Sequence, residues 1–268
     1  MLPFASILLA VLVLLGLTAH AKADFVEGWR AYQRGEYAIA LQLWTELAED
    51  GDPVAQYNVG VMYDEGAGVD RDDAKVIAWW NKAAAQGHQM AQHNLALLYI
   101  ERGSQEDFGR AANWLKRAAE NGFVLSQYSL AKQFAAGLGV EKDNARALTL
   151  FLKAGNSGFV KAQYNLGKIY RDGIGVEVNH EVSMDWFRKA ALQGYAKAQE
   201  KIASRLASGV GVKSDVIEAL KWSILAIRQG RTTAQKIFDD LRKNMNAKQV
   251  AEAEIRARIF RPLVEIYQ

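Results

Sequence analysis

The sequence predicts an all-α protein, a solenoid of stacked antiparallel helix pairs with about fourteen helices. Three sets of residues recur with one period of about 36 residues and support this fold. The glutamines are Gln56, Gln92, Gln127, Gln163 and Gln199, the glycines are Gly87, Gly122, Gly158, Gly194 and Gly230, and the large apolar residues are Trp79, Trp114, Leu150, Trp186 and Trp222. Because three independent sets keep the same register, one structural unit is repeated. Stacking such units buries the apolar surface that a lone hairpin leaves open.

Residues 1–23 are predicted to be a signal peptide. The segment from Leu2 to Ala19 is almost wholly apolar and uncharged, and A-x-A cleavage patterns then end at Ala21 and at Ala23. No Lys or Arg precedes this segment, so an uncleaved inner-membrane anchor is the alternative, and its 18 residues at about 1.5 Å each cover about 27 Å. We expect cleavage after Ala21 or Ala23, a periplasmic or secreted chain, and no membrane span after cleavage.

The first repeat shows why each unit is expected to form two helices. Asp52 followed by Pro53 is typical of a helix N-cap and first helical position. The glycines within residues 66–69 then interrupt the helical pattern, and Asp72 or Asp73 is placed to cap a second helix. The unit therefore predicts a helix, a short turn and an antiparallel helix.

The repeated pattern is similar to that of Sel1-like repeats, which are relatives of the tetratricopeptide repeat. Residues 162–176 carry A-Q-Y-N-L-G-x-x-Y-x-x-G-x-G-V, and residues 186–194 carry W-x-x-x-A-A-x-x-G. The resemblance covers residues 53–230 and implies five such repeats in a right-handed α-solenoid. The second repeat departs from the pattern because it lacks G-x-G-V, and the third has Leu150 and Phe151 where Trp is expected.

Both ends of the array resemble caps. Residues 24–52 resemble a plain tetratricopeptide hairpin that caps the N-terminal side. Residues 231–268 are expected to form a half-repeat and a capping helix. In this segment, Asn246 with Gln249 resembles a capping box that opens the last helix.

The composition excludes several classes of protein. A net charge of +3, from 33 basic and 30 acidic residues, is too balanced for a nucleic-acid-binding surface. The absence of Cys excludes disulfides, a Cys-ligated metal and a thiol nucleophile. Residues 24–89 carry 12 acidic and 5 basic residues, a net −7, so the charge is uneven along the chain.

The sequence contains little that predicts catalysis. It has no H-E-x-x-H, G-x-S-x-G, P-loop or dinucleotide-binding pattern, and the five-residue spacing of His88 and His93 is wrong for two ligands on one helical face. We therefore predict no catalytic residue, no metal and no cofactor. Ser129 and Lys132 form an S-x-x-K pattern without S-D-N or K-T-G, which leaves a β-lactamase-like envelope hydrolase as a remote alternative.

The best candidate site is a binding groove. In the related repeats the first helix of each pair lines the concave face, and the corresponding positions here give a set of aromatic, histidine and basic side chains. These candidate partner-binding residues are Tyr57, His93, Tyr128, Lys132, Tyr164, Lys168 and Arg171. A basic and aromatic groove favours an acidic peptide or an anionic glycan. Alternatively, the tyrosine row packs against the next helix, while Trp186 and Trp222 are expected to be structural.

The functional prediction follows from the family resemblance. It implies an exported bacterial adaptor for an envelope complex, without an active site, that binds protein partners through the concave face. A module that binds peptidoglycan or another polysaccharide through the tyrosine row is the alternative.

Overall fold

The computed structural model of the chain describes residues 19–263, with side chains described from Asp24 onward. Residues 1–18 of the predicted signal peptide lie outside the described residues, and both predicted cleavage sites fall early in the first helix. The described residues form fourteen helices and no strand, which confirms the all-α prediction. None of the helices described is long and apolar enough to cross a membrane.

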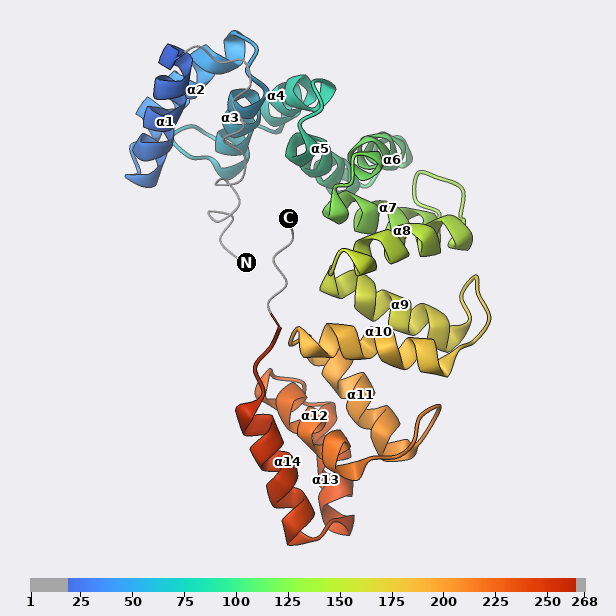
Figure 1. Cartoon of the computed structure of the whole chain (residues 1–268). Helices are drawn as coiled ribbons and strands as arrows, with labels where there is room; N and C mark the ends of the chain where they lie inside the picture. The colour runs from blue at the N-terminus through green and yellow to red at the C-terminus, as the bar shows by residue number, and fades with distance from the viewer. Residues whose placement is uncertain (1–18, 264–268) are drawn as a thin grey trace. The chain divides into compact units, whose positions relative to one another are not determined.

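The chain divides into two compact units, and the boundary between them along the sequence lies between Ser104 and Gln105. Figure 1 labels the helices of both units. Unit 1 contains α1 (Ala19–Gln33), α2 (Tyr37–Glu49), α3 (Pro53–Glu65), α4 (Asp73–Ala85) and α5 (Gln89–Arg102). Each helix of unit 1 packs against the next along the chain. Unit 1 is thus a stack of antiparallel hairpins.

Unit 2 continues the same alternation of helices. It contains α6 (Gln105–Glu120), α7 (Val124–Ala136), α8 (Asn144–Asn156), α9 (Val160–Asp172), α10 (His180–Leu192), α11 (Ala196–Ser208), α12 (Val216–Arg228), α13 (Ala234–Asn244) and α14 (Ala247–Ile259). We call α3, α5, α7, α9 and α11 the first helices of the repeats, and α4, α6, α8, α10 and α12 the second helices. Within unit 2 each helix from α6 to α12 packs on its successor, and α14 packs on α12.

Side-chain caps begin most of the second helices. Asp72 accepts hydrogen bonds from the backbone N–H groups of Ala74 and Lys75, so it caps α4, and Asp73 lies inside the helix. Asp143, Asn179 and Asp215 cap α8, α10 and α12 in the same way. These bonds satisfy amide groups that have no partner within a helix.

In each G-x-G-V turn, the second glycine packs closely against the start of the second helix of the preceding hairpin. Gly139 has a φ of +69°, and a Cβ there would lie 2.2 Å from the carbonyl carbon of Phe108 in α6. Only glycine fits such a close backbone approach. The same close contact is made by Gly68 with Tyr37, by Gly175 with Asn144 and by Gly211 with His180. The second repeat has no such loop, and the boundary between the two units falls there.

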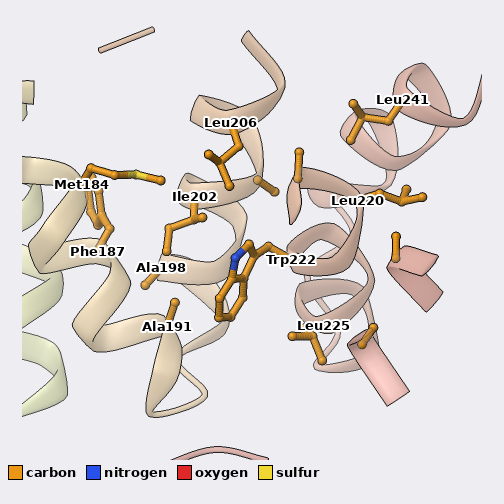
Figure 2. Close-up of a cluster of buried hydrophobic side chains, with 14 of the residues drawn as sticks. Met184, Phe187, Ala191, Ala198, Ile202, Leu206, Leu220, Trp222, Leu225 and Leu241 are labelled. Atoms are coloured by element: carbon orange, nitrogen blue, oxygen red, sulfur yellow. The ribbon is translucent and has the colours of Figure 1, made fainter. Parts of the chain in front are cut away.

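Large buried side chains alternate with glycines in the core. A Cβ at Gly167 would lie 2.5 Å from the ring of Phe187, and one at Gly60 would lie 2.3 Å from the ring of Trp80. Phe151 is buried at the register of Trp80 and Phe187. The stacked aromatic and aliphatic side chains of α10, α11 and α12 are seen in Figure 2.

The C-terminal cap closes unit 2. Asn246 and Gln249 form the capping box expected at the start of α14. Beyond α14 the chain turns back, so that the ring of Phe260 meets Trp222 edge-on at 5.5 Å. The backbone N–H of Leu263 donates to the carbonyl of Leu192 at the end of α10, 2.9 Å away.

Candidate functional site

The repeated glutamines are structural and do not belong to the candidate face. Each one is buried, and its Nε2 donates to a carbonyl eight residues earlier at the end of the preceding helix, over 2.9–3.3 Å. The acceptors are Ala48, Ala84, Ala119, Gly155 and Ala191. Carbonyls at a helix end lack intrahelical partners, so the glutamine satisfies one of them at each junction.

In unit 1 the candidate residues are packed against neighbouring side chains. Tyr57 is 9% exposed, and its ring stacks on His88 at 4.7 Å and on Trp80 at 6.1 Å. Its hydroxyl accepts a hydrogen bond from Nδ2 of Asn94 in the next repeat at 3.0 Å. Burial raises the pKa of Tyr57 to about 12. His93 is also buried, at 6% exposure, and burial lowers its pKa to about 4.

In unit 2 the equivalent tyrosines keep part of their surface open. Tyr128 is half-buried, with the rings of Phe159 at 4.9 Å and Phe151 at 5.8 Å, and its hydroxyl accepts from Asn165 at 3.3 Å. Tyr164 is half-buried against Phe187 at 5.6 Å and Tyr195 at 5.3 Å. Burial raises the pKa of both tyrosines. In unit 2, packing therefore buries only part of the Tyr128 and Tyr164 side chains.

One pairing rule holds at this row position in the first, third, fourth and fifth repeats, and sequence inspection missed it. The row residue contacts the residue 31 positions later, which precedes the next first helix: Tyr57 with His88, Tyr128 with Phe159 and Tyr164 with Tyr195. In the fifth repeat an ion pair replaces the aromatic pair, because Glu200 accepts hydrogen bonds from the guanidinium of Arg231. The constant spacing of 31 residues between the members of each pair was the signal in the sequence that could have revealed these contacts.

The basic candidates lie on α7 and α9 of unit 2. Lys132 is exposed, Lys168 is half-buried, and neither forms an ion pair with a described carboxylate. The Lys132 ammonium lies 6.0 Å from the ring centre of Tyr128. Arg171 is held by Asp172 through two contacts of 2.6 Å, and this guanidinium lowers the pKa of Asp172.

Sequence inspection did not identify a further arginine that lies beside this group. Arg205 is 8% exposed at a register that holds Met62 in the first repeat and Ile169 in the fourth. Its guanidinium donates to the carbonyl of Val210 at 3.4 Å, and burial lowers its pKa. Unit 2 thus gathers Tyr128, Tyr164 and a group of cations on its first helices. We call the set Tyr128, Lys132, Tyr164, Lys168 and Arg171 the α7–α9 face.

The repeat profile of a known family matches this chain. The Sel1 repeat profile matches residues 53–88, 89–123, 124–159, 160–195 and 196–230, which is more than half of the chain. The chain belongs to the Sel1 repeat family. Comparison with curated proteins finds no match.

Two solved Sel1 repeat structures extend the comparison. The first is c5321 from uropathogenic Escherichia coli, described as a protective antigen, with a TM-score of 0.79, 31% identity and coverage of 89% of this chain. This chain spans only 54% of that protein's length. The second is a Sel1 repeat protein from Oxalobacter formigenes, with a TM-score of 0.71, 25% identity and coverage of 87% of this chain and 96% of the other. Sel1 repeat proteins commonly serve as scaffolds that bind protein partners.

The structure does not bring together the two residues of the S-x-x-K pattern in this Sel1 repeat protein. Ser129 is half-buried and Lys132 is exposed, and no described hydrogen bond joins them. No group of three or more described His, Asp and Glu side chains is placed to hold a metal ion. The Sel1 repeat fold is typically a non-catalytic interaction scaffold.

Proposed function

We propose that this Sel1 repeat protein is an exported, non-catalytic adaptor that binds a protein partner through the α7–α9 face. The observation that carries this proposal is the contrast within one row of residues. Tyr57 is buried in unit 1, whereas Tyr128 and Tyr164 in unit 2 keep exposed edges beside Lys132 and Lys168. Aromatic edges beside unpaired cations are typical of surfaces that bind proteins.

The charge of the face favours an acidic partner segment. Lys132 and Lys168 lack ion pairs with described carboxylates, so an incoming Asp or Glu gains attraction without breaking an existing pair. The rings of Tyr128 and Tyr164 are already held by neighbouring aromatic rings, which leaves less of each ring for stacking on a sugar. We therefore favour a peptide over a glycan.

Export rests on the hydrophobic N-terminal segment and its A-x-A patterns. The description of the E. coli relative as a protective antigen supports a location that antibodies reach. We propose that this chain acts outside the cytoplasm, in the periplasm or beyond it. Fractionation of cells with and without Ala21→Asp and Ala23→Asp together should show that the processed chain is lost from the periplasm.

Site-specific crosslinking in cells tests the binding face. A photo-crosslinking amino acid at Lys132 of α7 is compared with one at Lys153, an exposed lysine on the second helix α8. We expect a discrete protein adduct at position 132 and none at position 153. The adduct should weaken when Lys168→Glu is added, because the reversal repels an acidic segment.

Two results would contradict the proposal. An adduct at position 153 alone would place the contact on the second helices. No adduct at either position, together with retention on an anionic polysaccharide, would favour the glycan-binding alternative.

A further inference from the structure

The closing helix α14 carries an exposed apolar stripe. Ala247, Ala251, Ile255 and Ile259 follow one another every four residues, so they lie on one face of the helix, with the exposed Lys248 on the same face near its N-terminal end. Ile255 is 50% exposed and Ile259 is 67% exposed. The opposite face, with Ala253 and Ala257, is buried in the core of unit 2. Terminal caps of repeat arrays normally present a polar outer face for solubility, which this stripe does not provide.

No described segment of the chain covers this stripe. Residues 260–263, which follow α14, turn away from it, since Phe260 packs on Trp222 and Leu263 bonds to Leu192 at the end of α10. In Figure 1, α14 forms the outer layer at the C-terminal end of unit 2. The stripe is therefore an unpartnered helix face on the described part of the molecule.

From Glu252 onward, the charges on α14 fall into two groups with different partners. Arg256 bonds to Glu252 within α14 and to Glu218 of α12, each at 2.8 Å, so these three charges are satisfied within the chain. Glu254 and Arg258 border the apolar stripe and form no described ion pair, although they stand four residues apart on one helix. A Glu and an Arg at this spacing can pair with each other, and here they do not.

The arrangement of these charges fits a second copy of the same helix. We propose that two copies of the chain associate through α14 in antiparallel orientation, about a two-fold axis near Ile255. In this orientation Glu254 of one helix faces the end of the other helix that carries Arg256 and Arg258. Glu254 of each copy then lies within one turn of Arg258 of the other copy, and Ile255 packs against its counterpart. A parallel pair would instead set Glu254 against Glu254, which is repulsive.

The size of the surface sets the strength of the association. Thirteen residues make a helix about 20 Å long, and one such contact is smaller than a standard stable interface. We therefore expect a dimer that forms and dissociates with concentration. This inference does not depend on the proposed partner face, because α14 is separate from α7 and α9.

Sedimentation of the purified protein, expressed from its own Met1, tests the proposal from about 1 μM to 1 mM. We expect the average mass to rise toward that of a dimer. Glu254→Arg and Arg258→Glu should each weaken dimerisation at least about tenfold, because each sets like charges opposite each other. An equal mixture of the two variants should dimerise again, because one chain then carries arginine at both positions and the other carries glutamate at both. Lys153→Glu on α8 is the matched control and should dimerise as the parent does.

The possible outcomes distinguish a specific contact through α14 from nonspecific self-association. A parent chain that stays monomeric throughout the range would overturn the proposal and leave the stripe to another partner. A dimer that tolerates both charge reversals would mean that α14 is not the interface. Circular dichroism of each variant shows whether the fold is intact, and folded monomeric variants that do not recover on mixing would also reject the antiparallel pairing.

Discussion

The same row of residues is part of the core in unit 1 and part of the surface in unit 2. Tyr57 and His93 are buried, whereas Tyr128 and Tyr164 are half-buried. The positions are equivalent in the repeat, and Tyr57 and Tyr128 share an aromatic neighbour 31 residues later and an asparagine in the next repeat. Equivalent positions in a repeat therefore share a local contact pattern without sharing a degree of exposure.

The largest expected effect comes from removing the buried member of the row. Tyr57→Ala should lower the free energy of unfolding of unit 1 by about 3–5 kcal/mol, as for other buried aromatic side chains. Tyr164→Ala should cost clearly less, because that side chain already contacts solvent and its hydroxyl has no described asparagine partner. Urea unfolding, with hydrogen exchange to assign the loss to one unit, measures both. Equal losses for the two variants would show that exposure does not distinguish the units.

The second largest expected effect is the loss of stability of unit 1 in acid. Burial lowers the pKa of His93 to about 4, and that of His88 also to about 4. Because the unfolded state binds protons more readily, the stability present above about pH 6.5 is lost as the pH falls toward 4. The slope is about 1.4 kcal/mol per pH unit for each histidine, and His93 should approach it more closely because it is more deeply buried.

A matched variant isolates the histidine contribution to the acid response. His88→Phe places at position 88 the residue found at the equivalent positions 123 and 159. Protonation of His88 also removes the acceptor that its Nδ1 offers to the backbone N–H of Ala91 at 3.2 Å. The variant should therefore flatten the stability curve of unit 1 between pH 6.5 and 5. An unchanged acid response would assign it to other groups.

The repeat period of the sequence was enough to predict most of the fold, and the local side-chain pattern was enough to predict the helix caps. The 36-residue register predicted the helix pairs, Asp52 caps α3 as expected, and Asn246 with Gln249 opens α14. The tyrosine row could not be resolved from sequence because its exposure depends on neighbours contributed by other helices. His93 and Tyr128 occupy equivalent positions, yet His93 is buried and Tyr128 is half-exposed. The ion pair of Glu200 with Arg231 was missed because each residue alone is an ordinary surface charge.

The smallest expected effect is a gain, and it tests whether the hydroxyl–asparagine contact matters. The register continues into the N-terminal hairpin, since Trp44 donates to the carbonyl of Phe25 as Trp80 donates to that of Tyr57. Phe25 thus stands where a tyrosine would meet the next asparagine. That asparagine, Asn58, is 1% exposed, and neither its Nδ2 nor its Oδ1 has a described hydrogen-bond partner.

Phe25→Tyr supplies the missing oxygen, so it should stabilise unit 1 by about 1 kcal/mol, the net value of a typical hydrogen bond. Tyr57→Phe is the reciprocal change and should cost about the same, because it leaves the Nδ2 of the half-buried Asn94 without its acceptor. Paired urea titrations of the two variants and the parent measure both effects. In the background of Asn58→Leu the benefit of Phe25→Tyr should vanish, because the donor is gone and the new hydroxyl is buried without a partner. A gain that survives in that background would mean that the tyrosine stabilises through packing and not through the asparagine.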